Sequence, residues 1–386
     1  MNIFAELAML VQTEWQKKSN SLEDFPEIAT RCLEKFKYDL NKEQLDHALA
    51  EWFLNSSSTE LPEQIHVHNT FGQPPITVFN NENFVVDIYI WLNFDTSIHS
   101  HGFRGAFRVL HGSSLHEEFT VKTLGEVARD VAMTDLGTPE MEVLTPGDVR
   151  TIRPSQELTH RVIHLENPTV TLCVKTINEP EISQWHYFGN GLAIKKRHVP
   201  PGLIKEIYYF QYLMQQNSEY ALEFLTRLFN QQDISIQMNL CEDISSGTLD
   251  LTDDVAQIIL NEVLSRHSQD DWFKRYEAVN LLAETELHFE TCDSPLLRLT
   301  AHFINQSLSL TEAQPFISEL AGRELSKKEI VGLVVALVDV ESVFQLELSD
   351  DDLTALKRHI ENPKEKVSAR LQVIPQLAKM RAFVQS

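Results

Sequence analysis

The sequence lacks the cysteine pattern of a disulfide framework or a thiolate zinc site. It has four cysteines in 386 residues, far apart and without a Cys-x-x-Cys pair: Cys32, Cys173, Cys241 and Cys292. Thiols this sparse are typical of reduced, buried cysteines. Residues 1–18 are typical of an amphipathic helix and lack the basic and apolar regions of a secretory signal. We therefore expect a cytoplasmic protein.

A block of positive charge is also absent. The formal net charge is −23, and the isoelectric point is about 5.0. Binding to nucleic acid or to an anionic membrane surface depends on clustered Lys and Arg side chains, so we expect neither partner. The longest apolar run, residues 330–340, is too short to span a bilayer. The acidic excess indicates solubility rather than a site.

Several catalytic motifs are missing as well. The sequence has no G-x-S-x-G, no phosphate-binding P-loop, no G-x-G-x-x-G that opens a helix, and no H-E-x-x-H. These absences argue against a nucleophile-elbow hydrolase, a P-loop nucleotide hydrolase, a dinucleotide-binding enzyme and a zincin protease.

What is present divides the chain into three regions. Residues 1–60 carry helical periodicity. Residues 61–199 contain eight short segments rich in β-branched and aromatic residues, separated by Pro, Gly, Asn or Asp, which predicts an antiparallel sandwich or barrel. Residues 200–386 return to helical periodicity, and most of these helices follow a Ser, Asp or Thr that suits an N-cap. We predict an α+β fold with N-terminal helices and an all-α C-terminal domain.

The chemistry of the chain centres on residues 95–112, DTSIHSHGFRGAFRVLHG. His99 and His101 are two residues apart, so on a strand both side chains point to the same face. Two imidazoles on one face can bind one metal ion. The competing interpretation is two polar residues in a turn at the edge of a strand.

The spacing of this stretch resembles the first motif of the cupin superfamily. That motif reads Gly, five residues, His-x-His, three or four residues, Glu, six residues, Gly. Here His99 and His101 are followed at the right intervals by Gly105 and Gly112. Asn93 stands in the first Gly position, and Gly105 stands where the family has a metal-binding Glu.

A looser match to the second cupin motif follows. Pro146 and Gly147 open it, Pro154 comes one place late, and the inner Gly is absent. His160 comes two places late, and His164 stands in the Asn position. The resemblance covers roughly residues 71–176 and implies a cupin-type antiparallel β-barrel, also called a double-stranded β-helix.

The resemblance implies a metal site made of His99, His101 and His160. Without the Glu, this three-histidine set is similar to that of the thiol dioxygenases, the cysteine dioxygenase-like group, which use Fe(II) and O₂ to oxidise a thiol to a sulfinate. The Ser-x-His-x-Tyr segment of that group is absent here. Imidazoles alone also suit Ni, Zn, Cu or Mn, so those metals stay open.

Two further residues are candidates for a catalytic role. Arg104 lies in the turn after His101, where its guanidinium can reach the pocket mouth and hold a carboxylate; an ordinary surface Arg fits equally. Strand parity puts His164 on the same face as His160, although a supporting or core histidine is the commoner role.

Parity also predicts which neighbours share the interior. If Gly105 faces inward, Phe107 and Val109 line the barrel and Arg108 points outward. Tyr89 and Trp91 share the parity of His99 and form either a cavity wall or core packing. The aromatic cluster 185–188 could close over the site or anchor the barrel to the helices, and we expect the anchor. A second His-x-His, His66 and His68, is expected at a solvated strand end.

Three functions remain open from the sequence. The first is a mononuclear metal enzyme, with Fe(II) as the leading metal, O₂ as oxidant and a small molecule, such as a thiol, as substrate. The second is a non-catalytic binding or sensor module, whose helical half contacts a protein partner or a second copy of the chain. The third is a barrel that has lost its metal.

Overall fold

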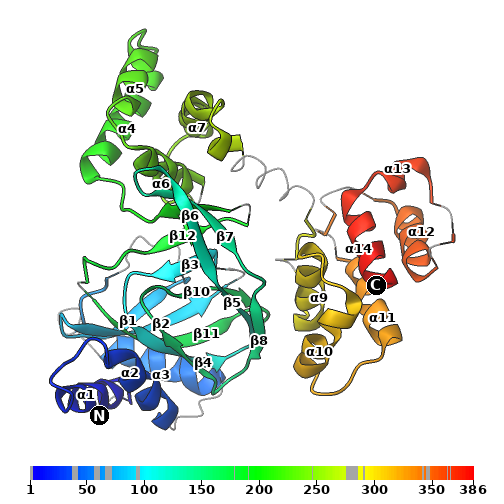
Figure 1. Ribbon diagram of the computed structural model, residues 1–386, viewed down its shortest axis with the longest axis horizontal. Helices are drawn as coiled ribbons and strands as arrows, with labels where there is room; N and C mark the ends of the chain where they lie inside the picture. Colours follow the sequence, from blue (N-terminus) through cyan, green and yellow to red (C-terminus); the bar gives the residue numbers. More distant parts are fainter. Residues whose placement is uncertain are drawn as a thin grey trace.

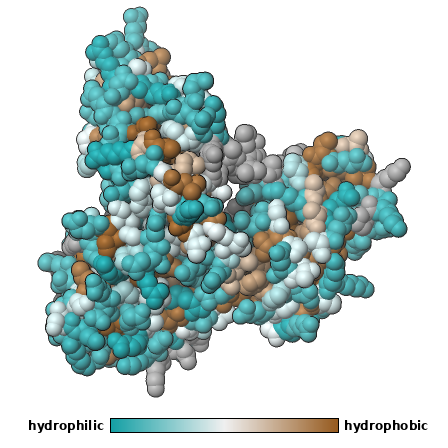
Figure 2. All heavy atoms as spheres, in the orientation of Figure 1, coloured by the Kyte–Doolittle hydropathy of each residue, from teal (hydrophilic) through white to brown (hydrophobic). Residues whose placement is uncertain are grey.

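The structure is a computed structural model and describes residues 3–36, 42–55, 61–65, 72–92, 96–177, 179–189, 191–245, 247–274, 286–289, 292–340, 343–344, 348–362, 364–365 and 367–386. A β-rich body carries helices on several sides (Figure 1). Hydrophilic residues cover most of the face shown in Figure 2, in agreement with the acidic composition.

The elements follow the predicted order of helices, strands and helices. The N-terminal helices are α1 (Ile3–Gln16), α2 (Phe25–Lys35) and α3 (Lys42–Asn55). The strands are β1 (Pro75–Asn80), β2 (Phe84–Trp91), β3 (Ile98–His101), β4 (Gly105–His111), β5 (Ser114–Phe119), β6 (Val121–Ala128), β7 (Val131–Leu136), β8 (Glu140–Leu144), β9 (Val149–Ile152), β10 (Ser155–His164), β11 (Thr169–Thr176), β12 (Trp185–Tyr187) and β13 (Leu192–Lys195). The later helices are α4 (Pro201–Gln215), α5 (Ala221–Phe229), α6 (Ile234–Ser245), α7 (Asp253–His267), α9 (Pro295–Asn305), α10 (Leu310–Leu320), α11 (Lys327–Leu337), α12 (Asp350–Glu361), α13 (Ala369–Gln372) and α14 (Pro375–Gln385).

The strands form two antiparallel sheets that curl around a shared interior. One sheet has the order β1-β2-β11-β4-β9, and the other has the order β6-β7-β13-β12-β3-β10-β5-β8. Buried side chains from both sheets pack together between them, including Phe107 and Val109 of β4 and Leu158 of β10. The predicted α+β class with a cupin-like double-stranded β-helix is confirmed.

Strand β4 shows how alternation sets the two faces. Phe107 and Val109 point into the barrel, as predicted. Arg108, between them, points outward, and its guanidinium donates to the backbone carbonyls of Leu33 and Phe36 at the end of α2. The buried cation therefore ties β4 to the C-terminal end of α2, where the last carbonyls of a helix accept hydrogen bonds from outside it.

The cluster 185–188 anchors the barrel to the helices, as expected: Phe188 packs against the core of α4 to α7, and His186 Nδ1 lies 2.9 Å from an oxygen of Glu242 on α6. Trp185–Tyr187 forms β12, which pairs with β3 and β13 inside the larger sheet. His186 of β12 is in register with His99 of β3. These residues belong to the barrel itself and lie beside the strand that carries the histidine pair.

Each group of helices covers a different outer surface of the barrel. The N-terminal helices share a hydrophobic core with the five-stranded sheet. Helices α4 to α7 pack against Val131, Leu192 and Ile194 of β7 and β13. Helices α9 to α14 pack against Leu115 of β5 and Ile163 of β10, among others. The helical region after residue 200 therefore contributes to two separate cores.

Three helices of the last group have a Ser at the N-cap, as predicted for most of these helices, and each begins with a capping box. The hydroxyls of Ser309, Ser326 and Ser349 each accept a hydrogen bond from the backbone amide three residues on, and the acidic side chain there bonds back. These bonds satisfy amides that the first turn leaves without partners. Within the described residues, no helix combines the length and apolarity that a membrane crossing requires.

Helix α9 is tied to the barrel by buried polar contacts. Glu117 of β5 is 1% exposed and accepts hydrogen bonds from Arg161 of β10 and from His302 of α9. Arg298 of α9 donates to the backbone carbonyl of His164. Two neighbouring strands of the barrel, β5 and β10, are thus joined to α9 by these two sets of contacts.

Candidate metal centre

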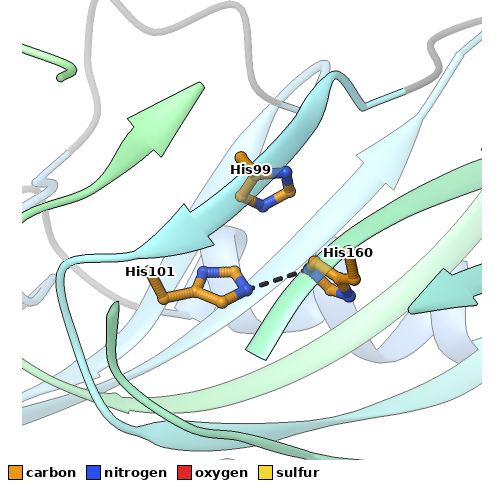
Figure 3. Close-up of side chains that lie close together, drawn as sticks. All are labelled: His99, His101 and His160. Carbon is orange, nitrogen blue, oxygen red and sulfur yellow. Dashed lines mark hydrogen bonds between the residues drawn. The ribbon is translucent and has the colours of Figure 1, made fainter. Parts of the chain in front are cut away.

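Two adjacent strands bring three histidines together. His99 and His101 lie on β3 and point to the same side, as their spacing predicts (Figure 3). His160 lies on β10, which pairs with β3 in a register that places His160 opposite His99. The pairing of β10 with β3 thus places the third imidazole beside the first two, although it lies about 60 residues later in the chain.

The three rings converge closely enough to share one ion. One nitrogen from each ring lies within 4.8 Å of the others. The Nε2 atoms of His101 and His160 are 2.9 Å apart, as the dashed line in Figure 3 marks. Two ligand nitrogens at roughly 2.1 Å from one ion and at a right angle to each other are separated by about 3 Å. The donor set therefore fits a transition-metal ion.

Burial keeps these imidazoles neutral, which is the form that binds metal. His99, His101 and His160 are each at most 5% exposed. Burial lowers the pKa of His99 to about 4. Burial, followed by the neighbouring histidines, holds the pKa of His101 and that of His160 well below the ordinary value. At neutral pH each ring presents a lone pair rather than a positive charge.

The hydrogen bond at the far side of His99 fixes which nitrogen faces the cluster. Its Nδ1 lies 2.7 Å from the backbone carbonyl of Ser97. Because a carbonyl only accepts, Nδ1 carries the hydrogen, and Nε2 keeps the lone pair. Metal-binding histidines in proteins are oriented in this way.

A series of hydrogen bonds that no sequence motif indicates supports His160; it is buried at His116 and partly exposed at its outer end. His116 of β5 places its Nε2 2.8 Å from His160 Nδ1, and its own Nδ1 lies 2.9 Å from an oxygen of Glu142 on β8. Arg150 donates to both oxygens of that carboxylate. These residues come from different strands with no motif spacing, so strand order alone brings them together.

The position of the missing cupin Glu has no room for a side chain. A Cβ at Gly105 would lie 2.1 Å from the carbonyl oxygen of Val174 and 2.9 Å from Lys175 Cα on the paired strand. Gly112 is constrained too, since its φ is +76° and a Cβ would lie 2.7 Å from Thr169 Oγ1. The spacing of the motif is therefore kept by backbone packing, and the site has no fourth protein ligand from Gly105.

We predict that Gly105→Ala destabilises the protein by about 3 kcal/mol, the upper end for an overpacked site, because the new methyl group meets main-chain atoms. Gly125→Ala is the matched control, since a Cβ there meets nothing within 4 Å. Urea denaturation of both variants measures the difference. Equal midpoints for the two variants would contradict the close strand packing at Gly105.

A cavity of about 1730 Å³ opens beside the three histidines. Tyr89 and Trp91 line it, as does Lys175, and both aromatics also belong to the buried core between the sheets, so each has both expected roles. Lys175 pairs with Asp87, which is fully buried, and donates to the Tyr89 hydroxyl. Phe107 lies on the wall next to His160. Next to the imidazoles, the wall thus combines aromatic rings with the Lys175 ammonium.

The two candidate catalytic residues occupy different places. His164 lines the cavity, stacks on Trp91 with ring centroids 4.4 Å apart, and shares a hydrogen bond with Ser114 Oγ. Burial lowers its pKa to about 3. Arg104 forms an ion pair with Glu179 and is not among the described residues that line the cavity. A catalytic role for either residue stays a prediction.

The two later helical groups also reach the cavity. His186 of β12 lines it and bonds through Nδ1 to Glu242 of α6. From α9, His302 lines another part of the wall. The cavity therefore lies where the barrel meets both helical groups. Three residues named in the sequence, His66, His68 and Asn93, lie outside the described residues.

Comparisons with known proteins find only distant structural similarity. No family model matches the sequence, and no curated protein matches it. Each of three solved structures covers about a third of this chain. A double-stranded β-helix protein from Klebsiella pneumoniae is 15% identical over 31% of this chain and 88% of its own, with a TM-score of 0.20. A hydroquinone 1,2-dioxygenase in complex with cadmium is 18% identical over 29% and 68%, with a TM-score of 0.21. A sugar phosphate isomerase of the cupin superfamily from Silicibacter pomeroyi is 12% identical over 32% and 75%, with a TM-score of 0.22.

Proposed function

We propose that this chain is a mononuclear metal enzyme that uses O₂ to oxidise a small substrate, with Fe(II) as the leading metal and a thiol as the leading substrate class. The observation that carries the proposal is the buried group of three neutral imidazoles beside a cavity. His99, His101 and His160 would hold the ion.

The donor set supports a redox-capable or Lewis-acidic ion rather than a hard one. Three imidazoles without a carboxylate suit iron, nickel, copper or zinc better than magnesium or calcium. A bound ion would bring substrate and oxidant together and activate both. Three protein ligands leave further coordination positions for that purpose.

The residues around the cluster perform the remaining tasks. Trp91 and Phe107 make an apolar wall that excludes water from the reacting groups. Lys175 lines the same cavity, where its ammonium, although paired with Asp87, can donate a hydrogen bond to a polar part of a substrate. His164 lies on the wall and can orient a substrate by hydrogen bonding. Arg104 is proposed to hold a substrate carboxylate at the mouth of the pocket. For this role its ion pair with Glu179 would first have to open.

Oxygen uptake tests this function. Protein loaded with Fe(II) is expected to consume O₂ when a small thiol is added, and the product should be two oxygen atoms heavier by mass spectrometry. Zinc-loaded protein is the control and should consume none. If no small thiol in a panel of neutral, cationic and anionic compounds supports uptake, the oxidation of thiols is contradicted.

A binding or sensor module is the second candidate, and one observation favours it. Arg161, next to His160, pairs with Glu117, which also binds His302 of α9. Occupation of the cavity can therefore be communicated to helices α9 to α14, which would contact a protein partner or a second copy of the chain. Metal binding without O₂ uptake, together with a ligand-dependent change in oligomeric state, would favour this candidate over the enzyme.

A further inference from the structure

His116 is buried behind the metal cluster and has no role in the function proposed above. It is 3% exposed, and its ring centroid lies 5.0 Å from that of His160. On β5 it stands opposite Val162 of β10 and opposite Glu142 of β8. Its two ring nitrogens are thus both engaged, one with His160 and one with the Glu142 carboxylate.

The Glu142 carboxylate, at one end of this series of hydrogen bonds, determines which ring nitrogens of the two histidines carry a hydrogen. Hydrogen bonds from Arg150, and then from His116, lower the pKa of Glu142 to about 2, so the carboxylate is ionised and only accepts. His116 Nδ1 must then carry a hydrogen and donate it. In the neutral ring, Nε2 is left with a lone pair that can only accept.

The tautomer of His116 in turn determines that of His160. Because His116 Nε2 accepts, His160 Nδ1 must carry the hydrogen of the 2.8 Å bond between them. A neutral His160 then has its lone pair on Nε2, the atom that lies 2.9 Å from His101 Nε2 in the cluster. The series of hydrogen bonds that runs from Arg150 to His160 therefore leaves a lone pair on His160 Nε2. This lone pair can bind metal, and it faces the other two histidines.

We propose that His116, held by Glu142 and Arg150, is a positioning residue that fixes the tautomer and the ring orientation of His160 for metal binding. The inference rests on the proposed metal centre and adds the residues that orient one of its ligands. A ligand imidazole held in this way is more basic and loses less rotational freedom on binding. Ser97 does the same for His99 through its carbonyl, so two of the three ligands are set before an ion arrives.

Two substitutions separate this role from packing. His116→Phe keeps a ring but removes the acceptor, whereas His116→Gln offers an amide oxygen that can accept from His160 Nδ1. The matched control is His111→Phe, at the end of the neighbouring β4 and outside the metal cluster. Circular dichroism confirms that each full-length variant is folded.

Metal affinity gives the first measurement. Competition between each protein and a chromogenic chelator for Co(II) should show a 10- to 100-fold weaker affinity for His116→Phe, the usual range for a lost supporting partner. His116→Gln should recover most of that loss, and His111→Phe should match the wild type. Equal affinities for wild type and a folded His116→Phe would overturn the proposal.

Histidine tautomers in metal-free protein give the second measurement, which does not depend on metal. Two-bond ¹H–¹⁵N spectra of histidine-labelled protein should show His160 with its hydrogen on Nδ1 in the wild type and a mixture in His116→Phe. Hydrogen on Nε2 of His160 in the wild type would overturn the proposal. If the wild type binds no metal but shows the expected tautomer, the proposed function fails while the positioning of His160 stands.

Discussion

His160→Ala is expected to abolish stoichiometric metal binding while the barrel stays folded. The substitution removes one of three imidazole ligands, and loss of a supporting residue alone typically weakens metal affinity by 10- to 100-fold. We expect the loss of a ligand to exceed about 100-fold. Backbone pairing of β10 with β3 and β5 does not involve the side chain, so the sheet should persist. Elemental analysis and circular dichroism on the same sample measure both outcomes.

The control for this variant is His111→Ala, which removes an imidazole from β4 without touching the cluster. It should retain the metal content of the wild type. If His160→Ala retains it too, the third ligand has been assigned to the wrong residue.

Glu117→Gln is expected to have the largest effect on stability. The carboxylate is buried between Arg161 and His302, and its neutral replacement leaves a cation without its counter-charge. Breaking a buried ion pair from one side costs about 3–5 kcal/mol. Urea denaturation should therefore show a clearly lower midpoint than the wild type. Glu118→Gln, an exposed neighbour on the same strand, should leave the midpoint unchanged.

The same carboxylate makes stability depend on pH. Burial alone would raise the pKa of Glu117, but the contacts with His302 and Arg161 outweigh it and lower the pKa to about 2, from 4.5 in the unfolded chain. A lowered pKa stabilises the fold above pH 4.5, and the contribution, on the order of 3 kcal/mol, is lost as the pH falls from about 4.5 to about 2. The difference between wild type and Glu117→Gln should shrink over that range. A constant difference would contradict an ionised Glu117.

The sequence predicted the parts of the site that are local along the chain. His99 and His101 share a face because strand side chains alternate, and that geometry needs no tertiary information. The inward placement of Phe107 and the outward placement of Arg108 follow from the same rule. Gly105 stands in the position of the Glu of the cupin motif, and only the close approach of Val174 explains why no side chain fits there.

The parts of the site that depend on the order of the strands could not be predicted from the sequence. His116 and Glu142 are single polar residues on separate strands, and only the pairing of β5 with β8 and β10 makes them neighbours of His160. Strand β12 has three residues, too few for a periodic signal, and its pairing with β3 is likewise long-range. One sequence carries no direct record of such registers.

The sequence also did not predict that the later helices form two groups, again because their packing depends on tertiary contacts. Helical periodicity shows which face of each helix is apolar, but not which partner covers that face. Helices α4 to α7 and α9 to α14 have comparable patterns, yet they pack on different edges of the larger sheet. The cavity at their junction with the barrel could therefore not be foreseen.

The metal content of the full-length chain tests the central claim most directly. Protein purified without a polyhistidine tag, dialysed and analysed by inductively coupled plasma mass spectrometry should contain about one transition-metal ion per chain, or take up one on reconstitution with Fe(II) under anaerobic conditions. Less than a tenth of an ion per chain, both before and after reconstitution with iron, nickel, copper, manganese and zinc, would contradict a metal centre at His99, His101 and His160.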